Sequence, residues 1–240
     1  EDQRGEIGLT QFTQPALYVV NALTWRARLE DGKPAPAYLA GHSLGEYNAL
    51  QAAGVFDFAT GLRMVQRRGA LMGQVTGGGM AAVIGLPPDR IEAVLAASDE
   101  GRRIDVANFN SSDQTVIAGP DADIAAVQPE LEAAGARKVS VLKVSAPFHS
   151  RYMRAPMLEF AEFLKGFTFA APSIPVIANV SAQPYPHDAV RDTLARQIGH
   201  SVRWLDTMHY LFDHGVTDVE EVGPGTVLAK LAQRIRKARP

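Results

Sequence analysis

The stretch that decides the fold is residues 37–54, Ala-Tyr-Leu-Ala-Gly-His-Ser-Leu-Gly-Glu-Tyr-Asn-Ala-Leu-Gln-Ala-Ala-Gly. Its first four residues are apolar and predict a short buried strand that ends at Gly41. Residues 44–53 are good helix formers, and Gly54 is a typical residue to close a helix. The stretch therefore predicts a strand, a tight turn and a helix, with Ser43 at the turn.

The turn has the pattern Gly-x-Ser-x-Gly at residues 41–45, and the flanking strand and helix give that pattern its meaning. Glycine neighbours relieve crowding in such a turn, so the Ser43 hydroxyl projects outward. The main-chain N–H of Leu44, at the start of the predicted helix, is placed to donate to a developing oxyanion. The same three residues also occur by chance in loops, but the setting favours a nucleophilic serine.

A nucleophilic serine needs a base, and the chain offers six histidines. His42 is next to Ser43, but adjacent side chains on such a turn diverge, so His42 is a poor base. His149 lies where a predicted strand gives way to a turn and a helix, which is typical of catalytic loop residues. From the residues alone, a structural and a catalytic role for His149 stay equally open. The remaining histidines are expected at the surface: His187, His200, His209 and His214.

The middle of the chain, residues 79–145, predicts a self-contained subdomain. Its pattern alternates between apolar runs typical of strands and amphipathic segments typical of helices, in the order β-α-β-β-α-β. That order is the ferredoxin-like one. We therefore expect a ferredoxin-like subdomain inserted into a larger domain formed by residues 1–78 and 146–240. The predicted segments are residues 80–85, 88–97, 104–108, 114–118, 122–134 and 136–144.

The larger domain shows mixed helix and strand patterns. Residues 15–25 carry apolar residues at helical spacing and predict a helix, with Pro15 suited to its first turn. Further helices are predicted at residues 59–72, 154–164, 188–197 and 204–215 and from residue 227, and further strands at residues 175–180 and 218–222. Together with the insert, this organisation predicts an α/β fold class.

The composition of the 240-residue chain is that of a globular domain, with 46% apolar and 21% charged residues. A net charge of −2 provides no basic field, so we expect no nucleic-acid partner. The absence of cysteine excludes disulfides, a thiolate nucleophile and a Cys-based zinc site, and we expect no metal centre. No apolar run is long enough to span a bilayer, and residues 1–4 do not start a signal peptide. We therefore expect a cytoplasmic protein without membrane contact.

A series of motifs occurs in order along the chain: residues 41–47 (Gly-His-Ser-Leu-Gly-Glu-Tyr), 66–72 (Gln-Arg-Arg-Gly-Ala-Leu-Met), 79–86 (Gly-Met-Ala-Ala-Val-Ile-Gly-Leu), 108–111 (Asn-Phe-Asn-Ser), 146–150 (Ala-Pro-Phe-His-Ser), 201–204 (Ser-Val-Arg-Trp) and 221–225 (Glu-Val-Gly-Pro-Gly). Together these motifs resemble those of malonyl-CoA:acyl carrier protein transacylases and polyketide synthase acyltransferase domains. Residues 10–15 and the Phe before His149 are most similar to the free-standing acyltransferases that serve polyketide synthases in trans. The resemblance covers essentially the whole chain and implies an α/β-hydrolase-like large domain with a ferredoxin-like insert.

The resemblance implies roles for individual residues. Ser43 would take the acyl group as an ester, and His149 would act as general base and later as general acid. No Asp completes a triad in this family; a main-chain carbonyl orients the imidazole, and Gln197 matches its position. Arg68 resembles the arginine that binds the malonyl carboxylate with paired hydrogen bonds, which a guanidinium does well. A surface arginine like its neighbour Arg67 is the alternative.

Other positions are candidates for substrate binding. Phe148 would narrow the space beside the acyl α-carbon and disfavour a 2-methyl group, or it is simply a core aromatic. His42 and Met72 lie in matched motifs. Asn110 lines the cleft or only forms a turn between two strands of the insert.

The implied activity is transfer of malonyl from malonyl-CoA to the phosphopantetheine thiol of an acyl carrier protein, by a monomer without a bound cofactor, in polyketide or fatty acid synthesis. One alternative is a hydrolase of carrier-protein thioesters, against which the anion-binding Arg68 argues. Another is a non-catalytic module that docks on carrier protein. It is favoured by residues 1–9, which do not resemble the family's opening strand and Gly-Gln-Gly-Ser/Ala-Gln loop. Gln11 and Gln14 belong to a later family segment, so truncation, supply of that loop by another chain and loss of activity all stay open.

Overall fold

A computed structural model describes residues 2–186 and 188–239. The predicted surface position of His187 lies outside these residues. The helices are α1 (Thr10–Glu30), α2 (Gly45–Ala52), α3 (Phe58–Gly73), α4 (Pro88–Ala97), α5 (Asp121–Ala133), α6 (Arg154–Leu164), α7 (Val190–Gln197), α8 (Trp204–Asp213) and α9 (Val227–Ala238). The strands are β1 (Leu39–Ala40), β2 (Gly79–Ile84), β3 (Asp105–Ser111), β4 (Gln114–Gly119), β5 (Lys138–Val141) and β6 (Val176–Ile177).

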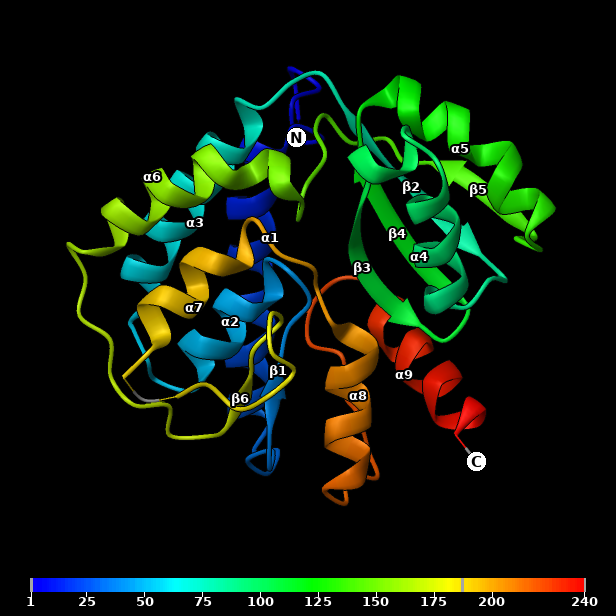
Figure 1. Cartoon of the computed structure of the whole chain (residues 1–240). Helices are drawn as coiled ribbons and strands as arrows, with labels where there is room; N and C mark the ends of the chain where they lie inside the picture. Colours follow the sequence, from blue (N-terminus) through cyan, green and yellow to red (C-terminus); the bar gives the residue numbers. More distant parts are fainter. Residues whose placement is uncertain (1, 187, 240) are drawn as a thin grey trace.

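The four central strands form one antiparallel sheet in the order β3-β4-β2-β5 (Figure 1, green). Side chains alternate between its two faces, as in any strand. One face, with Ala81, Val83 and Ile117, packs against apolar residues of α4 and α5. The predicted β-α-β-β-α-β order is therefore confirmed for the described residues. The predicted limits of the insert, residues 79 and 145, stay a prediction.

The opposite face of this sheet belongs to a second apolar cluster that includes Met80, Ala82 and Val116. Phe148, which follows β5, packs against this cluster and also against the main core. The sheet is thus covered on both faces, and Phe148 lies where the insert meets the rest of the molecule.

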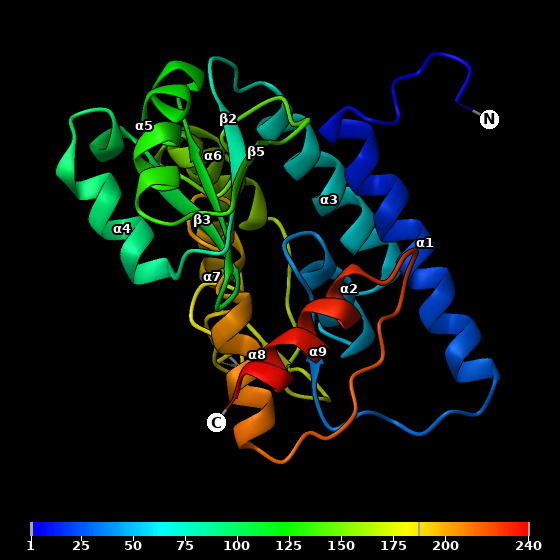
Figure 2. The same ribbon diagram turned by 90° about the vertical axis from the view of Figure 1, so that its right-hand side faces the viewer.

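The rest of the chain surrounds the short parallel pair of β1 and β6, in which Leu39 is paired with Val176. On one side, helices α1, α2, α3, α6 and α7 enclose the main core. On the other side, α8 and α9 enclose a smaller cluster around Trp204 and Met208. Figure 2 shows α1 and α3 running side by side at the edge of the molecule, away from the insert. Within the described residues, no helix has both the length and the apolar character needed to cross a bilayer.

Helix α1 begins at Thr10, so the prediction that Pro15 lies in a first turn is wrong. The reason is a close contact between helices. A Cβ on Gly69 of α3 would lie 3.1 Å from the Cα of Gln11, so the glycine lets the start of α1 approach α3. Burial of Gln14 against α3 then extends the helix ahead of the proline.

The strand predicted at residues 218–222 is also wrong, because this segment pairs with no strand. Its side chains are held by polar contacts instead. Glu220 forms ion pairs with Arg28 and Lys33, and Glu221 accepts a hydrogen bond from the main-chain N–H of Ala229 at the start of α9. The acidic pair in this segment therefore fixes a loop, although the flanking valines resemble a strand pattern.

Candidate active site

Ser43 lies on a tight turn between β1 and α2, as predicted from the sequence. Its backbone has a φ of 51°, in the left-handed region that side chains rarely adopt. A Cβ on Gly41 would lie 2.0 Å from the main-chain carbon of Gly45, so only glycine fits there. The turn is fastened by Asn179, which follows β6. Its Oδ1 accepts from Ser43 N at 2.7 Å, and its Nδ2 donates to the Gly41 carbonyl at 2.7 Å.

The Ser43 hydroxyl contacts the imidazole of His149, with 2.7 Å between Oγ and Nε2. On the other side of the ring, Nδ1 lies 2.9 Å from the main-chain carbonyl oxygen of Gln197. A carbonyl oxygen can only accept, so Nδ1 carries the proton and Nε2 is free to accept the hydroxyl hydrogen of Ser43. His149 also has a left-handed backbone, with φ at 57°.

The imidazole of His149 is 4% exposed. Burial lowers its pKa to about 3, and the nearby positive charge of Arg68 adds to this effect. The ring is therefore neutral near pH 7, which is the form that can take a proton from Ser43. His149 Nε2 is therefore positioned to accept the proton of a nucleophilic Ser43 hydroxyl.

Arg68 of α3 is 1% exposed and points at Ser43. Its Nη2 donates to Ser43 Oγ at 3.0 Å and to Gln197 Oε1 at 2.9 Å, and its Nη1 donates to Gln14 Oε1 at 2.5 Å. In the part of the chain that the structure describes, no carboxylate lies within ion-pair distance of this guanidinium. Burial lowers the pKa of Arg68, yet an arginine keeps its charge in proteins. A buried cation held by neutral oxygens is thus next to the nucleophile.

The side chain of Gln197 links this cation to a buried carboxylate. Its Nε2 donates to the Ser43 main-chain carbonyl at 2.6 Å and to Glu46 Oε2 at 2.6 Å. Glu46 is fully buried, and its Oε1 also accepts from the Tyr185 hydroxyl at 2.5 Å and from Asn179 N at 3.1 Å. Burial raises the pKa of Glu46 to about 7.

The other predicted residues surround this centre. Leu44 directly precedes α2, and its main-chain N–H has no hydrogen-bond acceptor in the described chain. Met72 is joined to the site through Gln14, whose Nε2 lies 3.6 Å from its sulfur. Phe148, which precedes His149 in the sequence, packs where the main core meets the insert.

His42 turns away from Ser43 and lies 2.9 Å, Nε2 to Oδ1, from Asn110. Its ring is tilted against Trp204, with 5.6 Å between centroids. Strand β3 continues to Ser111, so the alternative that Asn110 forms a turn is wrong. Among the other histidines, His200 and His214 are exposed as expected, whereas His209 on α8 is half-buried.

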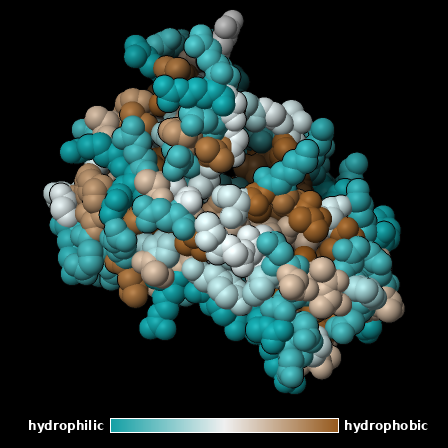
Figure 3. All heavy atoms as spheres, turned by 90° about the horizontal axis from the view of Figure 1, so that it is seen from above, coloured by the Kyte–Doolittle hydropathy of each residue, from teal (hydrophilic) through white to brown (hydrophobic). Residues whose placement is uncertain are grey.

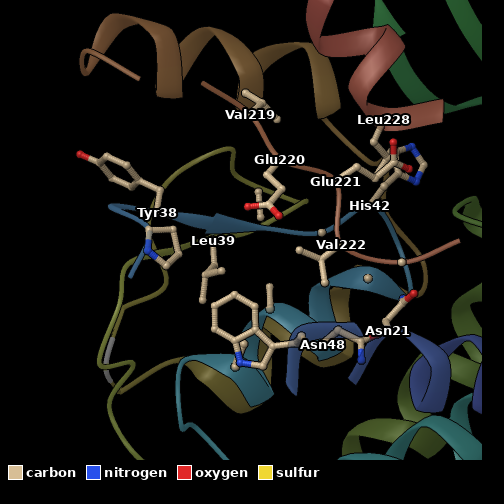
Figure 4. A pocket seen from close by; sticks show the side chains of 18 of the residues that line it. Asn21, Tyr38, Leu39, His42, Asn48, Val219, Glu220, Glu221, Val222 and Leu228 are labelled. Carbon is tan, nitrogen blue, oxygen red and sulfur yellow. Dashed lines mark hydrogen bonds between the residues drawn. The ribbon is translucent and has the colours of Figure 1, made fainter. Parts of the chain in front are cut away.

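Two cavities adjoin the site. The larger cavity has a volume of about 710 Å³ and adjoins the turn that carries Ser43. Gly41, His42 and Leu44 line it, together with Asn21 and Asn48 (Figure 4). The smaller, about 520 Å³, lies between α4 and the segment around His200, and His149 is part of its wall. Seen from the top of Figure 1, apolar side chains gather around a central depression (Figure 3).

Comparison of the sequence with known protein families identifies the family of this chain. The sequence model of the acyl transferase domain matches residues 1–237. The chain belongs to the acyl transferase domain family.

Relatives of this acyl transferase domain have roles in polyketide biosynthesis. It is 49% identical to the polyketide biosynthesis malonyl CoA-acyl carrier protein transacylase BaeC of Bacillus velezensis, over 98% of this chain and 82% of that protein. It is 52% identical to the polyketide biosynthesis protein ThaF of Burkholderia thailandensis. That match covers 98% of this chain but only 20% of ThaF, so the chain is similar to one part of a much longer protein.

A solved structure also matches. The malonyl CoA-acyl carrier protein transacylase of Burkholderia pseudomallei has a TM-score of 0.94 and 45% identity, covering 100% of this chain and 84% of that one. A malonyl-transacylase solved in complex with a type II polyketide synthase acyl carrier protein has a TM-score of 0.93 and 38% identity, covering 97% and 76%. These matches confirm the predicted fold class, an α/β-hydrolase-like large domain with a ferredoxin-like subdomain.

Sequence reasoning missed four residues of this acyl transferase domain's site: Gln14, Glu46, Asn179 and Tyr185. Two signals were available. Glu46 lies one turn after Ser43 and is the charged residue of a predicted helix that is otherwise uncharged. Asn179 follows a buried strand at its carboxyl end, where α/β folds gather functional side chains. Gln14 and Tyr185 carry no such signal, because their partners Arg68 and Glu46 are distant in the sequence.

Proposed function

We propose that this acyl transferase domain moves a malonyl group from malonyl-CoA to the phosphopantetheine thiol of an acyl carrier protein, through an ester on Ser43. The observation that carries the proposal is the buried guanidinium of Arg68, 3.0 Å from the Ser43 hydroxyl. The malonyl transacylases among its relatives support the same assignment, and so does the relative bound to a carrier protein. The relatives' names further support a place in polyketide or fatty acid synthesis.

In the first half-reaction, Ser43 Oγ attacks the thioester carbonyl of malonyl-CoA while its proton passes to His149 Nε2. The main-chain N–H of Leu44 donates to the oxyanion that forms. The coenzyme A sulfur leaves as the tetrahedral intermediate collapses, and it takes the proton from His149. The Gln197 carbonyl holds the Nδ1 proton of His149 throughout, which keeps Nε2 directed at the reacting atoms.

The second half-reaction repeats these steps with a different nucleophile. The phosphopantetheine thiol gives its proton to His149 Nε2 and attacks the ester carbonyl on Ser43. Ser43 then leaves and recovers its proton from His149. Donor and acceptor react in turn at one serine, which is a ping-pong mechanism.

Arg68 explains the choice of a dicarboxylic donor. Its partners Gln14, Gln197 and Ser43 offer neutral oxygens, and among the described residues no carboxylate forms a direct ion pair with it. A malonyl carboxylate can take up this charge with paired, charge-assisted hydrogen bonds. A neutral acyl group leaves the buried guanidinium without a carboxylate in direct contact.

Further residues of the proposal shape the acyl site. Phe148 lies beside His149 and narrows the space at the α-carbon, which favours malonyl over methylmalonyl. One methyl group in a pocket is worth about 1–3 kcal/mol, so the preference is graded. His42, Met72 and Asn110 complete the substrate-binding set of this proposal.

The test is incubation with labelled malonyl-CoA, followed by intact-mass measurement and transfer to a holo acyl carrier protein. A malonyl adduct on Ser43 that passes to the carrier protein supports transfer. Release of free malonate at the rate of acylation would indicate a hydrolase instead. Absence of an adduct would indicate a module that only docks on carrier protein. Ser43→Ala is the control for adducts at other residues.

A further inference from the structure

Glu46 lies one helical turn after Ser43 and is fully buried, but its carboxylate does not touch the reacting hydroxyl. Its two oxygens have different partners. Oε1 accepts from Asn179 N and from the Tyr185 hydroxyl, whereas Oε2 accepts, among the described residues, only from Gln197 Nε2. A buried carboxylate that is not used in the mechanism therefore contacts the residue that holds both His149 and Arg68.

The side-chain amide of Gln197 could in principle adopt two orientations, with its NH₂ and oxygen exchanged, and its hydrogen-bond partners decide between them. At present Nε2 faces two acceptors, Glu46 Oε2 and the Ser43 carbonyl, and Oε1 faces the Nη2 donor of Arg68. A flipped amide would set two oxygens against the amide oxygen and would direct an NH₂ group at the guanidinium. The hydrogen-bond network thus permits a single orientation of the Gln197 amide. The Glu46 carboxylate is one of the two acceptors that fix its NH₂ end.

We propose that Glu46 is a positioning residue that sets selectivity for anionic acyl donors: by fixing the Gln197 amide, it presents an oxygen to Arg68 and keeps the guanidinium directed at Ser43. The inference rests on the proposed function, because it concerns how the same site chooses its donor. Glu46 does so in either protonation state. A proton taken up by its carboxyl goes to Oε1, where it can be donated to the Tyr185 hydroxyl oxygen, while Oε2 still accepts from Gln197 Nε2.

The variant Glu46→Gln tests this link with almost no change in shape. One end of the new amide is an NH₂ group, which must face either Gln197 Nε2 or Asn179 N. The main-chain N–H cannot rotate, so the new NH₂ group faces Gln197 Nε2 and repels it. The Ser43 carbonyl opposes a simple flip of the Gln197 amide, so the side chain either flips at that cost or shifts, and both movements take its oxygen away from Arg68. Arg68 then loses a charge-assisted hydrogen bond and moves off Ser43.

We expect the ratio of Ser43 acylation rates with malonyl-CoA and acetyl-CoA to fall about tenfold in Glu46→Gln. The acetyl rate falls much less, because the His149 contact is to the main-chain carbonyl of Gln197 and stays in place. The matched control is Tyr185→Phe, which removes a buried hydrogen bond to the same carboxylate on the side away from Gln197. It should lower the melting temperature and leave the donor ratio as in the wild type.

Equal changes of the donor ratio in Glu46→Gln and Tyr185→Phe would overturn the inference, as would an unchanged ratio in Glu46→Gln. If Glu46→Gln does not fold, Gln197→Met keeps the main-chain carbonyl and deletes only the side-chain link. A lower ratio in Gln197→Met supports the link, and an unchanged ratio refutes it.

A crystal structure of Glu46→Gln provides a readout that does not depend on activity. A Gln197 amide still directed as in the wild type, with Arg68 in place, would refute the inference. Acylation of the wild-type protein by malonyl-CoA is measured in the same series. Its failure would contradict the proposed function, whereas its success with unaltered variant ratios would contradict only the role of Glu46.

Discussion

At the scale of single residues, the two side chains that meet at the site both have strained backbones. Ser43 and His149 adopt left-handed φ values of 51° and 57°. Such conformations cost about 1–3 kcal/mol each and persist only where surrounding contacts hold them. Asn179 accepts a hydrogen bond from Ser43 N and donates one to the Gly41 carbonyl, and the Gln197 carbonyl holds the imidazole of His149. The strain therefore lies in the backbone of the two residues that carry the reacting atoms, and residues from distant parts of the sequence stabilise it.

Arg68 and Arg67 allow a matched test of anion binding. Arg68→Ala should reduce malonyl acylation about ten- to a hundredfold more than acetyl acylation, because the lost hydrogen bonds are to a charged group. Arg67→Ala removes only an exposed ion pair with Glu159 and should change neither rate. Single-turnover acylation followed by mass spectrometry measures both. Equal losses for the two donors in Arg68→Ala would show that the guanidinium does not bind the carboxylate.

The lowered pKa of His149 predicts how activity varies with pH. With that pKa at about 3, the neutral base persists well below pH 6.5, so acylation of Ser43 should not decline as pH is lowered from 7 to 5. A decline centred near pH 6.5 in the single-turnover rate would show that the imidazole titrates normally.

The same pKa also predicts a stability effect. The unfolded chain takes up a proton at His149 near pH 6.5, but the folded chain does not, so native stability is lost as pH falls below 6.5. The loss is at most about 1.4 kcal/mol per pH unit. Urea unfolding at pH 7 and pH 5 should show a smaller decrease for His149→Gln than for the wild type. An equal decrease would assign the acid sensitivity to other groups.

At the scale of elements, the two glycines of the Gly-x-Ser-x-Gly turn are not equivalent. A Cβ on Gly41 would lie within 2.3 Å of main-chain atoms of Gly45 and Glu46, whereas a Cβ on Gly45 would meet nothing within 4 Å. Gly41 is thus required for β1 and α2 to come together, and Gly45 is only the first residue of α2.

Gly41→Ala should therefore disrupt the turn and abolish acylation of Ser43, with a destabilisation of several kcal/mol because the clash is with backbone. Gly45→Ala should fold normally, since alanine is the better helix former. Thermal melting and Ser43 acylation of the two variants measure the difference. A well-folded, active Gly41→Ala would contradict the close approach that the structure shows.

At the scale of the whole molecule, the insert is joined to the large domain by several polar contacts. Strand β3 pairs with Val202 through main-chain hydrogen bonds, and Arg151 forms an ion pair with Asp105. Tyr152 donates to the Arg103 carbonyl, and Phe148 packs into both parts. These contacts surround His149, so the base lies at the junction of the two parts.

The joined parts should unfold together. Both tryptophans, Trp25 and Trp204, lie in the large domain, so their fluorescence reports on that part, and far-UV circular dichroism reports on the whole chain. We expect the two urea transitions to coincide, as in a two-state protein. A second transition in circular dichroism without a change in fluorescence would mean that the insert unfolds on its own.

The sequence could predict the features that depend on local pattern. The turn at Ser43, the helix α6 and the order of elements in the insert follow from apolar spacing and glycine placement. Contacts between distant segments could not be predicted in this way. The position of Pro15 within its helix depends on Gly69, which lets α1 approach α3, and the buried links made by Glu46 depend on side chains from several elements.

The contact between His149 and Gln197 has a consequence for how such a site can change over evolutionary time. The group that orients the base is a carbonyl oxygen, which every amino acid possesses. Selection on the codon for position 197 therefore acts through the side-chain amide and its partners, while the orienting oxygen persists whatever residue is encoded. Substitutions at position 197 would therefore report only on the role of the side-chain amide. They would not reveal the role of the main-chain carbonyl that orients His149.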